Sequence, residues 1–192
     1  MYSLGGVSAP SSKNLWDIMR KEHLEPHDAR HIHDIWMQGH ADPLKHRVAS
    51  VLTGAQFAVF QENASRSPMF VLPIFKGPNA FESIVVQCQL PIVLITSLEE
   101  YKRGGSFAMP YMTVTHYTEL LPTKDVVLVR GDIINPQSLS QFEGTTLLRL
   151  MKEFYTDPAK HKFVHTFNHD QKSFDFKRML DSLGHDTSDL PR

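Results

Sequence analysis

Hydrophobic residues are most concentrated between Ser67 and Thr96, where three runs rich in Val, Ile, Phe and Leu follow one another. Runs of about five to eight residues with β-branched and aromatic side chains, bounded by Gly or Pro, are typical of strands. The clearest turn signal is Lys76-Gly77-Pro78-Asn79. Because a four-residue turn cannot make a parallel crossover, the first two strands should be antiparallel. We expect strands at 69–75, 81–90 and 92–98.

The apolar residues of these runs are too nearly continuous for a sheet that is wetted on one face, so helices should cover it. Alternation of period two in the stretch 111–117 predicts a half-buried strand, with Met112, Val114 and His116 on one face. Further strands are expected at 48–52 (an edge strand), 126–129 and 163–167. The sequence therefore predicts a single α+β domain with a mostly antiparallel sheet of about six to seven strands packed with helices.

Helical periodicity surrounds these strands. An N-terminal helical pair is expected within 12–40, with Pro26 ending the first helix and Asp28 capping the second. Thr53 and Gln56 form a capping-box signal for a third helix. Asn135-Pro136 and Ser140-x-x-Glu143 both offer start signals for the longest helix, which should run to Asp157-Pro158, and a last helix should end at Gly184. The apolar stripe of the longest helix comprises Leu139, Phe142, Leu147, Leu150, Met151 and Phe154.

The remaining segments are expected to be irregular. The segment 99–110, which contains Gly104-Gly105, should be a loop. Residues 1–11 should be disordered and residues 185–192 a polar tail, which leaves 12–184 as the domain. Arg130-Gly131-Asp132 matches a cell-adhesion tripeptide, but a strand end with a turn explains it equally well.

Composition excludes several classes of function. With 20 basic and 21 acidic residues the formal net charge is -1, so no global field attracts a polyanion and nucleic-acid binding is disfavoured. The longest apolar run, 90–95, is far shorter than the ~20 residues that cross a bilayer, so we expect no membrane insertion. The single Cys88 cannot form an internal disulfide and should be a buried hydrophobe. No transit peptide or secretory signal is visible in the first dozen residues.

Eleven histidines raise the question of a metal site. His27 and His31 have the i, i+4 spacing that can share a helical face, but Asp28 is the expected cap between them, and no Cys pair or H-E-x-x-H motif accompanies them. His161, His165 and His169, placed in a strand and turn, need not point the same way. We therefore predict scattered surface histidines, no metal site and no cofactor. No G-x-S-x-G, G-x-G-x-x-G or Walker motif is present.

The apolar stretch Phe107-Ala-Met-Pro-Tyr-Met112 allows two interpretations. It is either the entry of a core strand or an exposed patch of Met and aromatic residues, which are enriched where a surface packs on another chain. Trp36 extends an apolar helical face and should be core. Trp16 lies at the edge of such a face, where a Trp can serve as a binding anchor.

Six segments along the chain are informative when they are taken together: Ser12-Lys-Asn-Leu-Trp-Asp-Ile-Met19, Ile32-His-Asp-Ile-Trp36, Phe70-Val-Leu-Pro73, His116-Tyr-Thr-Glu-Leu120, Lys124-Asp-Val-Val-Leu-Val-Arg-Gly-Asp132 and Val164-His-Thr-Phe-Asn168. None is specific alone, but they cover nearly the whole span from 12 to 184. In this order they resemble one family, the mitochondrial ATP synthase assembly factors that chaperone the β subunit of the catalytic head.

The resemblance implies a non-enzymatic, monomeric chaperone of the mitochondrial matrix, with a plastid as the other compartment. It would cover the apolar, α-facing surface of the unassembled β subunit until α replaces it. From residue type alone, we expect the partner-binding residues to be Trp16, Met19, Phe107, Met109 and Tyr111. The alternative is an enzyme or small-ligand binder with a pocket between sheet and helices, using His116 and Glu119 as polar groups.

Overall fold

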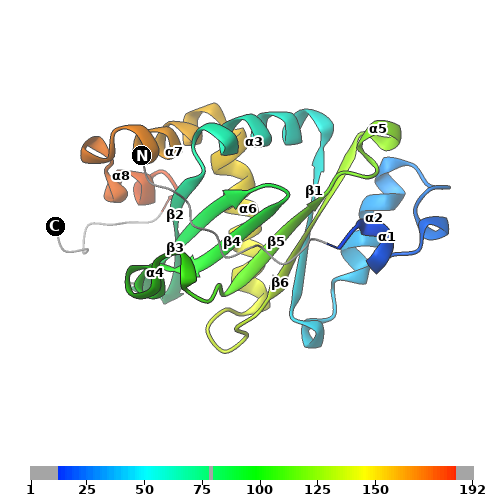
Figure 1. Ribbon diagram of the computed structural model, residues 1–192, viewed down its shortest axis with the longest axis horizontal. Coiled ribbons are helices and arrows are strands. Elements are labelled where there is room, and N and C mark those ends of the chain that lie inside the picture. Colours follow the sequence, from blue (N-terminus) through cyan, green and yellow to red (C-terminus); the bar gives the residue numbers. More distant parts are fainter. Residues whose placement is uncertain (1–12, 78–79, 185–192) are drawn as a thin grey trace.

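The computed structural model describes residues 13–77 and 80–184, whose strands form one antiparallel sheet with the order β1-β6-β5-β4-β3-β2 (Figure 1). The strong apolar runs therefore make one half of the sheet, and β1 is an edge strand, as predicted. Antiparallel pairing of β2 with β3 is also confirmed. The strands are β1 (Arg47–Thr53), β2 (Met69–Gly77), β3 (Ala80–Gln89), β4 (Ile92–Ser97), β5 (Met112–Tyr117) and β6 (Val126–Ile133).

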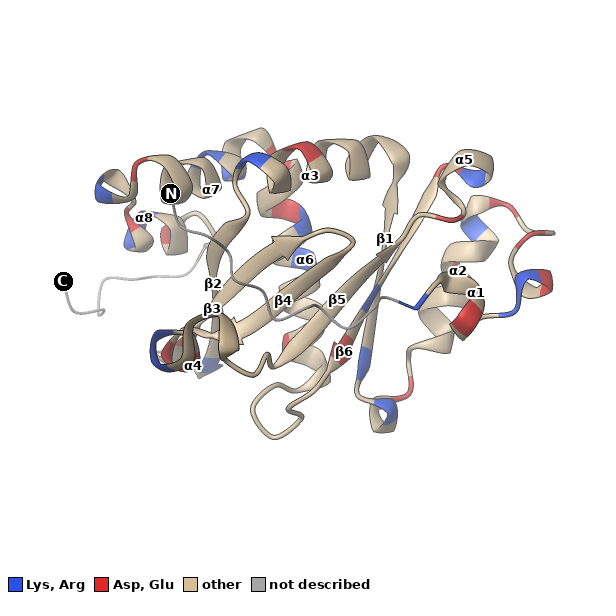
Figure 2. Ribbon diagram, viewed as in Figure 1, with Lys and Arg blue, Asp and Glu red and all other residues tan. Residues whose placement is uncertain are grey.

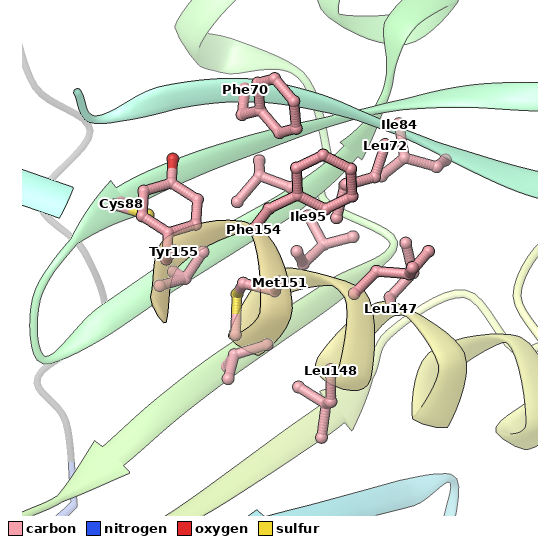
Figure 3. Close-up of a cluster of buried hydrophobic side chains, with 14 of the residues drawn as sticks. Phe70, Leu72, Ile84, Cys88, Ile95, Leu147, Leu148, Met151, Phe154 and Tyr155 are labelled. Carbon is pink, nitrogen blue, oxygen red and sulfur yellow. The ribbon is translucent and has the colours of Figure 1, made fainter. Parts of the chain in front are cut away.

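One face of the sheet is covered by the larger helices, and the main core lies between them. In Figure 1, α6 crosses behind the sheet. Figure 3 shows Leu147, Met151 and Phe154 of α6 beside side chains from β2, β3 and β4. The rings of Phe154 and Phe70 have centroids 5.1 Å apart. The helices that contribute to this core are α3 (Gly54–Arg66), α6 (Gln141–Thr156), α7 (Pro158–His169) and α8 (Phe176–Asp181).

The opposite face carries a second, smaller core where the N-terminal helices α1 (Leu15–Ile18) and α2 (Ala29–Gly39) pack on β1, β6 and the end of β5. Trp36 is fully buried there, and its indole N–H donates to the carbonyl of Val129 over 3.1 Å. The backbone N–H of Leu15 donates to Glu119 Oε1 over 2.6 Å. These two bonds tie α2 to β6 and α1 to the segment after β5, so the predicted α+β domain with an N-terminal helical pair is confirmed. The expectation that Pro26 ends the first helix is wrong, because α1 ends at Ile18 and a separate 3₁₀ turn (Lys21–His23) follows it.

The expected strand at 163–167 is wrong, because these residues lie within the helix α7. Val164, Thr166 and two Phe residues are typical of a strand, and Asp157-Pro158 ends the helix before them. The same dipeptide begins α7: Asp157 Oδ1 accepts from Ala159 N over 2.8 Å, and Pro158 occupies the first turn, where a missing N–H costs nothing.

Three smaller expectations also need correction. The segment 99–110 is not all loop, because the helix α4 (Leu98–Gly104) and a 3₁₀ turn (Gly105–Phe107) lie within it. Strand β6 extends through 126–133, so Gly131 is buried inside a strand and the Arg-Gly-Asp tripeptide is no exposed turn. Phe142 is 82% exposed, off the buried stripe of α6. The expected disordered residues 1–11 and polar tail 185–192 lie outside the described residues.

Candidate partner-binding surface

Exposed large hydrophobic side chains gather at one end of the sheet. In the described part of the chain, one exposed large hydrophobic residue, Val59, lies on α3, away from this end. The others lie in segments that adjoin a single end of the sheet: the turn before β1, the segment between β4 and β5, the segment after β6 and the first turn of α6. The strand pairings place these segments together, since Ile95 and Ile133 both pair with Met112 at the start of β5. We call the following side chains the apolar end: Leu44, Phe107, Met109, Ile134 and Phe142.

The segment that carries Phe107 and Met109 follows the short helix α4. Gly105 ends this helix with φ of 55°, a left-handed conformation that an L side chain rarely adopts. After the 3₁₀ turn the chain extends away from the core, and Phe107 and Met109 are 79% and 70% exposed. The interpretation of this stretch as an exposed patch therefore describes its first part, whereas Met112 at its end is buried and enters β5.

Backbone hydrogen bonds of Tyr111 join this segment to the one that carries Ile134. Tyr111 N donates to Ile95 O over 2.7 Å, and Tyr111 O accepts from Ile134 N over 2.8 Å and from Asn135 N over 3.2 Å. The Tyr111 side chain is half-buried and packs against the main core. Tyr111 thus fixes the backbone that carries the apolar end to the sheet, while Ile134 is one of the exposed side chains of the apolar end.

The first turn of α6, which carries Phe142, is held by a polar network. Ser140 caps α6 in a capping box with Glu143, and Lys76 Nζ donates to Glu143 Oε1 over 2.7 Å and to Ser138 O over 2.9 Å. Burial would raise the pKa of Glu143, but the hydrogen bonds from Lys76 and Ser140 lower it overall. Glu143 is anionic at neutral pH and is held by both Lys76 and Ser140. Phe142, which precedes it, therefore extends from an ordered turn.

The predicted contact residues do not form one surface. Phe107, Met109 and Tyr111 lie before β5, whereas Trp16 and Met19 lie beside α1, which is bonded to Glu119 after β5. The length of β5 separates the two groups by about 20 Å. Trp16 and Met19 are half-buried against the smaller core, and Lys21 Nζ lies 5.8 Å from the Trp16 ring centroid.

The pocket expected of the alternative function is not formed by His116 and Glu119. His116 lies in the main core beside Phe57 and Phe60, with its Nδ1 3.3 Å from Pro91 O. Glu119 is on the other side of the sheet, bonded to the start of α1. The two side chains do not converge, so they do not share a binding site.

Leu44, Ile134 and Phe142 were not expected at a binding surface. For Phe142 a signal was available: it precedes Leu147 by five residues, so at 100° per residue it lies about 140° from Leu147 around the helix axis. The exposure of Leu44 and Ile134 depends on how the 3₁₀ turn Pro43–Lys45 and the segment after β6 leave the sheet. No local sequence pattern predicts the direction in which these two segments leave the sheet.

Charged residues are sparse on the strands and frequent on the helices and turns, as Figure 2 shows. On β6, the Arg130 guanidinium donates to Asp132 Oδ1 over 2.5 Å, and Arg47 Nε of β1 lies 3.4 Å from the same carboxylate. Next to the apolar end, α4 carries the i, i+3 pairs Glu99–Lys102 and Glu100–Arg103. These pairs are exposed, so they leave the apolar end without a dominant charge of either sign.

Chemistry of other kinds has little support in the described residues. Burial raises the pKa of the Cys88 thiol to about 12, so it is protonated at neutral pH and is a buried hydrophobe, as predicted. In this part of the chain no three or more His, Cys, Asp or Glu side chains are grouped to hold a metal ion. Of the helices described, none is long and apolar enough to span a bilayer.

Comparison with known proteins identifies the family. A family model described as "ATP11 protein" matches residues 6–180, which is most of the chain. The chain belongs to the ATP11 family. The match includes the N-terminal helices, all six strands and the segments of the apolar end, so every element described so far except the end of α8 lies within the family's common region.

Individual ATP11-family relatives agree with this. The chain is 33% identical over 105 residues to "Protein atp11, mitochondrial" of Schizosaccharomyces pombe. The aligned region covers 50% of this chain and 36% of that protein. It is 28% identical to the Danio rerio "ATP synthase mitochondrial F1 complex assembly factor 1" over 87% of this chain and 54% of that protein. The Homo sapiens protein of the same name is 26% identical over 89% and 52%. The chain thus matches about half or less of the length of these relatives.

Proposed function

We propose that this protein is an assembly factor for the F1 part of ATP synthase and that it acts as a chaperone of the β subunit. The observation that carries the proposal is membership of the ATP11 family, whose relatives in two vertebrates are named F1 complex assembly factors. Those relatives are also named as mitochondrial, which supports a place of action in the mitochondrial matrix. The proposed action is binding without catalysis.

The physical requirement for such a chaperone is a surface that competes for exposed apolar area. An unassembled β subunit presents the apolar face that α later covers, and exposed apolar patches self-associate. A protein that occupies this face delays aggregation, and α displaces it if α binds more tightly. This cycle needs a reversible apolar contact and no nucleotide.

The apolar end supports this role because its side chains are large, exposed and held on ordered segments. Phe107 and Met109 are the strongest candidates for central contacts, since aromatic residues and Met are enriched in interface cores. A standard interface covers about 800 Å² on each partner. Trp16 and Met19 lie about 20 Å from the apolar end, so they stay in the proposal only as a separate, peripheral contact.

The proposal is tested by light scattering of isolated β subunit, with and without this protein, followed by addition of α. The wild-type protein should suppress scattering, and α should release β into αβ complexes. A Phe107→Ser/Met109→Ser variant should fold normally, because both side chains are exposed, but it should lose most of the suppression. Val59→Ser is the matched control, since Val59 is an exposed hydrophobic residue of α3 away from the apolar end.

Three outcomes would contradict parts of the proposal. Failure of the wild-type protein to slow β aggregation would reject the chaperone function. Protection of isolated α in preference to β would reject the β assignment. Equal protection by the wild-type and double-variant proteins would reject the apolar end as the contact surface and leave the function standing.

A further inference from the structure

The side chain of Lys76 reaches from β2 to the segment that leads into α6. Its Nζ donates to Glu143 Oε1 over 2.7 Å and to Ser138 O over 2.9 Å, and it lies 3.8 Å from Glu82 Oε2 of β3. Ser138 and Glu143 follow Lys76 by 62 and 67 residues. One ammonium group therefore joins the β2–β3 hairpin to a segment that is distant in the sequence.

This ammonium is the counter-ion of two carboxylates. The side chains of Glu143 and Glu82 are only 16% and 27% exposed, so water screens their charges incompletely. Like charges at short distance repel each other, and a partly buried charge without a partner is costly. Without Lys76 the two carboxylates would face each other with no cation between them. The first turn of α6 would then be pushed away from the hairpin.

The segment that Lys76 holds carries part of the apolar end. Ser138 lies between Ile134 and Phe142, which are 46% and 82% exposed. Glu143 also accepts from Ser140 N over 2.7 Å, a bond of the capping box that orders the start of α6. Removal of Lys76 therefore loosens the segment from Ile134 to Phe142 at two points, the carbonyl of Ser138 and the carboxylate of Glu143.

The other part of the apolar end is held separately. Phe107 and Met109 follow Gly105, and their segment is fixed to the sheet by Tyr111 N, which donates to Ile95 O over 2.7 Å. None of the three Lys76 contacts involves this segment. Loss of Lys76 should therefore loosen one part of the apolar end and leave the other in place.

We propose that Lys76 is a positioning residue of the apolar end, holding the segment 134–142 so that Ile134 and Phe142 form one surface with Phe107 and Met109. Its consequence for partner binding rests on the proposed function. A partner that covers the whole apolar end binds a preformed surface more tightly than one that it must first order. Lys76 acts through the segment and not by touching the partner.

Hydrogen exchange of the backbone amides, followed by mass spectrometry of the full chain, tests the positioning without any partner. Lys76→Met should speed exchange in 134–142 about tenfold and leave exchange in β3 and β4 unchanged. Lys76→Arg should restore slow exchange, because a guanidinium has donors enough for a carboxylate and a carbonyl. Glu143→Gln, added to Lys76→Met, should restore part of the protection, since Gln keeps the capping bond and removes the repulsion.

Lys152→Met is the matched control for these variants. Lys152 Nζ also donates to a backbone carbonyl, that of Val51, over 3.2 Å, in a partly buried setting. Lys152 follows Phe142 on α6 at a distance of about 15 Å along the helix. Its replacement should therefore leave exchange in 134–142 as it is in the wild type.

The affinity for immobilised β subunit tests the consequence for binding. Lys76→Met should weaken it about fivefold or more, whereas Lys76→Arg and Lys152→Met should keep it within about twofold. The proposal is overturned if Lys76→Met exchanges like the wild type in 134–142, if its exchange rises equally throughout the sheet, or if it binds β as tightly as the wild type. Failure of the wild type to bind β rejects the proposed function instead, and the exchange result then decides the role of Lys76 alone.

Discussion

The side-chain amide of Asn168 pairs with both backbone polar groups of Met69. Met69 N donates to Asn168 Oδ1 over 3.1 Å, and Asn168 Nδ2 donates to Met69 O over 2.5 Å. Met69 opens the edge strand β2, and these two groups point away from β3, because the neighbouring Pro68 O accepts from Cys88 N of that strand. Asn168 on α7 thus replaces one residue of a missing neighbouring strand. An unpaired strand edge invites association, and this contact closes its first position.

Replacing Asn168 with alanine should destabilise the protein by about 1–3 kcal/mol, the usual cost of leaving partly buried polar groups without partners. The same amide also donates to Val164 O over 2.7 Å, so the substitution removes three contacts at once. Urea denaturation followed by circular dichroism measures the loss, and size-exclusion chromatography shows whether the opened edge produces dimers.

Lys172→Ala is the control for this variant, because Lys172 is exposed in the 3₁₀ turn that follows α7. It should change the free energy of unfolding by less than about 0.5 kcal/mol. If Asn168→Ala is as stable as Lys172→Ala, the pairing with Met69 does not hold the edge.

Elements with strong local signals could be predicted from the sequence. The capping boxes Thr53–Gln56 and Ser140–Glu143 open α3 and α6, and Asp28 caps α2 by accepting from His31 N. Each signal depends on residues three positions apart, so the sequence contains all the information. The helix α7 is not predicted by such signals, because Asp157-Pro158 both ends one helix and begins the next.

The candidate site was only partly predictable, for a different reason. Exposure of Phe107 and Met109 depends on how the chain leaves α4 at Gly105, and their place beside Ile134 depends on hydrogen bonds between segments more than 20 residues apart. Residue type pointed to these side chains without giving their neighbours. The same reasoning grouped them with Trp16, which lies beyond the far end of β5.

Gly131→Ala should destabilise the protein by about 1–3 kcal/mol through overpacking. A Cβ at Gly131 would lie 2.6 Å from Val48 Cγ2 and 2.7 Å from Met112 Sδ. Met112 is fully buried and also faces Gly144 of α6, so it has little room to move. Chemical denaturation measures the effect.

Gly39→Ala is a matched glycine control, because nothing lies within 4 Å of its added Cβ and it sits in the last turn of α2. Helix propensity predicts a neutral effect or a gain of up to about 1 kcal/mol. Equal stability of the two variants would show that the Val48 and Met112 side chains shift easily to admit a methyl group at Gly131.

His116 should make the protein less stable as the pH falls below neutrality. Burial lowers the pKa of His116 to about 4, and in the unfolded chain the pKa of a histidine is about 6.5. Above pH 6.5 the ring is neutral in both states, so it contributes no pH dependence there. Between pH 6.5 and pH 4 the unfolded chain takes up a proton that the folded protein does not, and stability is lost progressively.

The expected loss from His116 between pH 7.5 and pH 5 is about 2 kcal/mol, from the linkage between pKa and folding. Burial also lowers the pKa of His40 and His161, and both act in the same direction. The contribution of His116 is therefore isolated by comparing wild type with His116→Phe, whose ring fits beside Phe57 and Phe60 and does not titrate. Urea denaturation from pH 5 to pH 7.5 should give a clearly shallower pH dependence for the variant. Parallel curves for the two proteins would mean that His116 is protonated in the folded state or reached by water, and that its burial in the core is not as described.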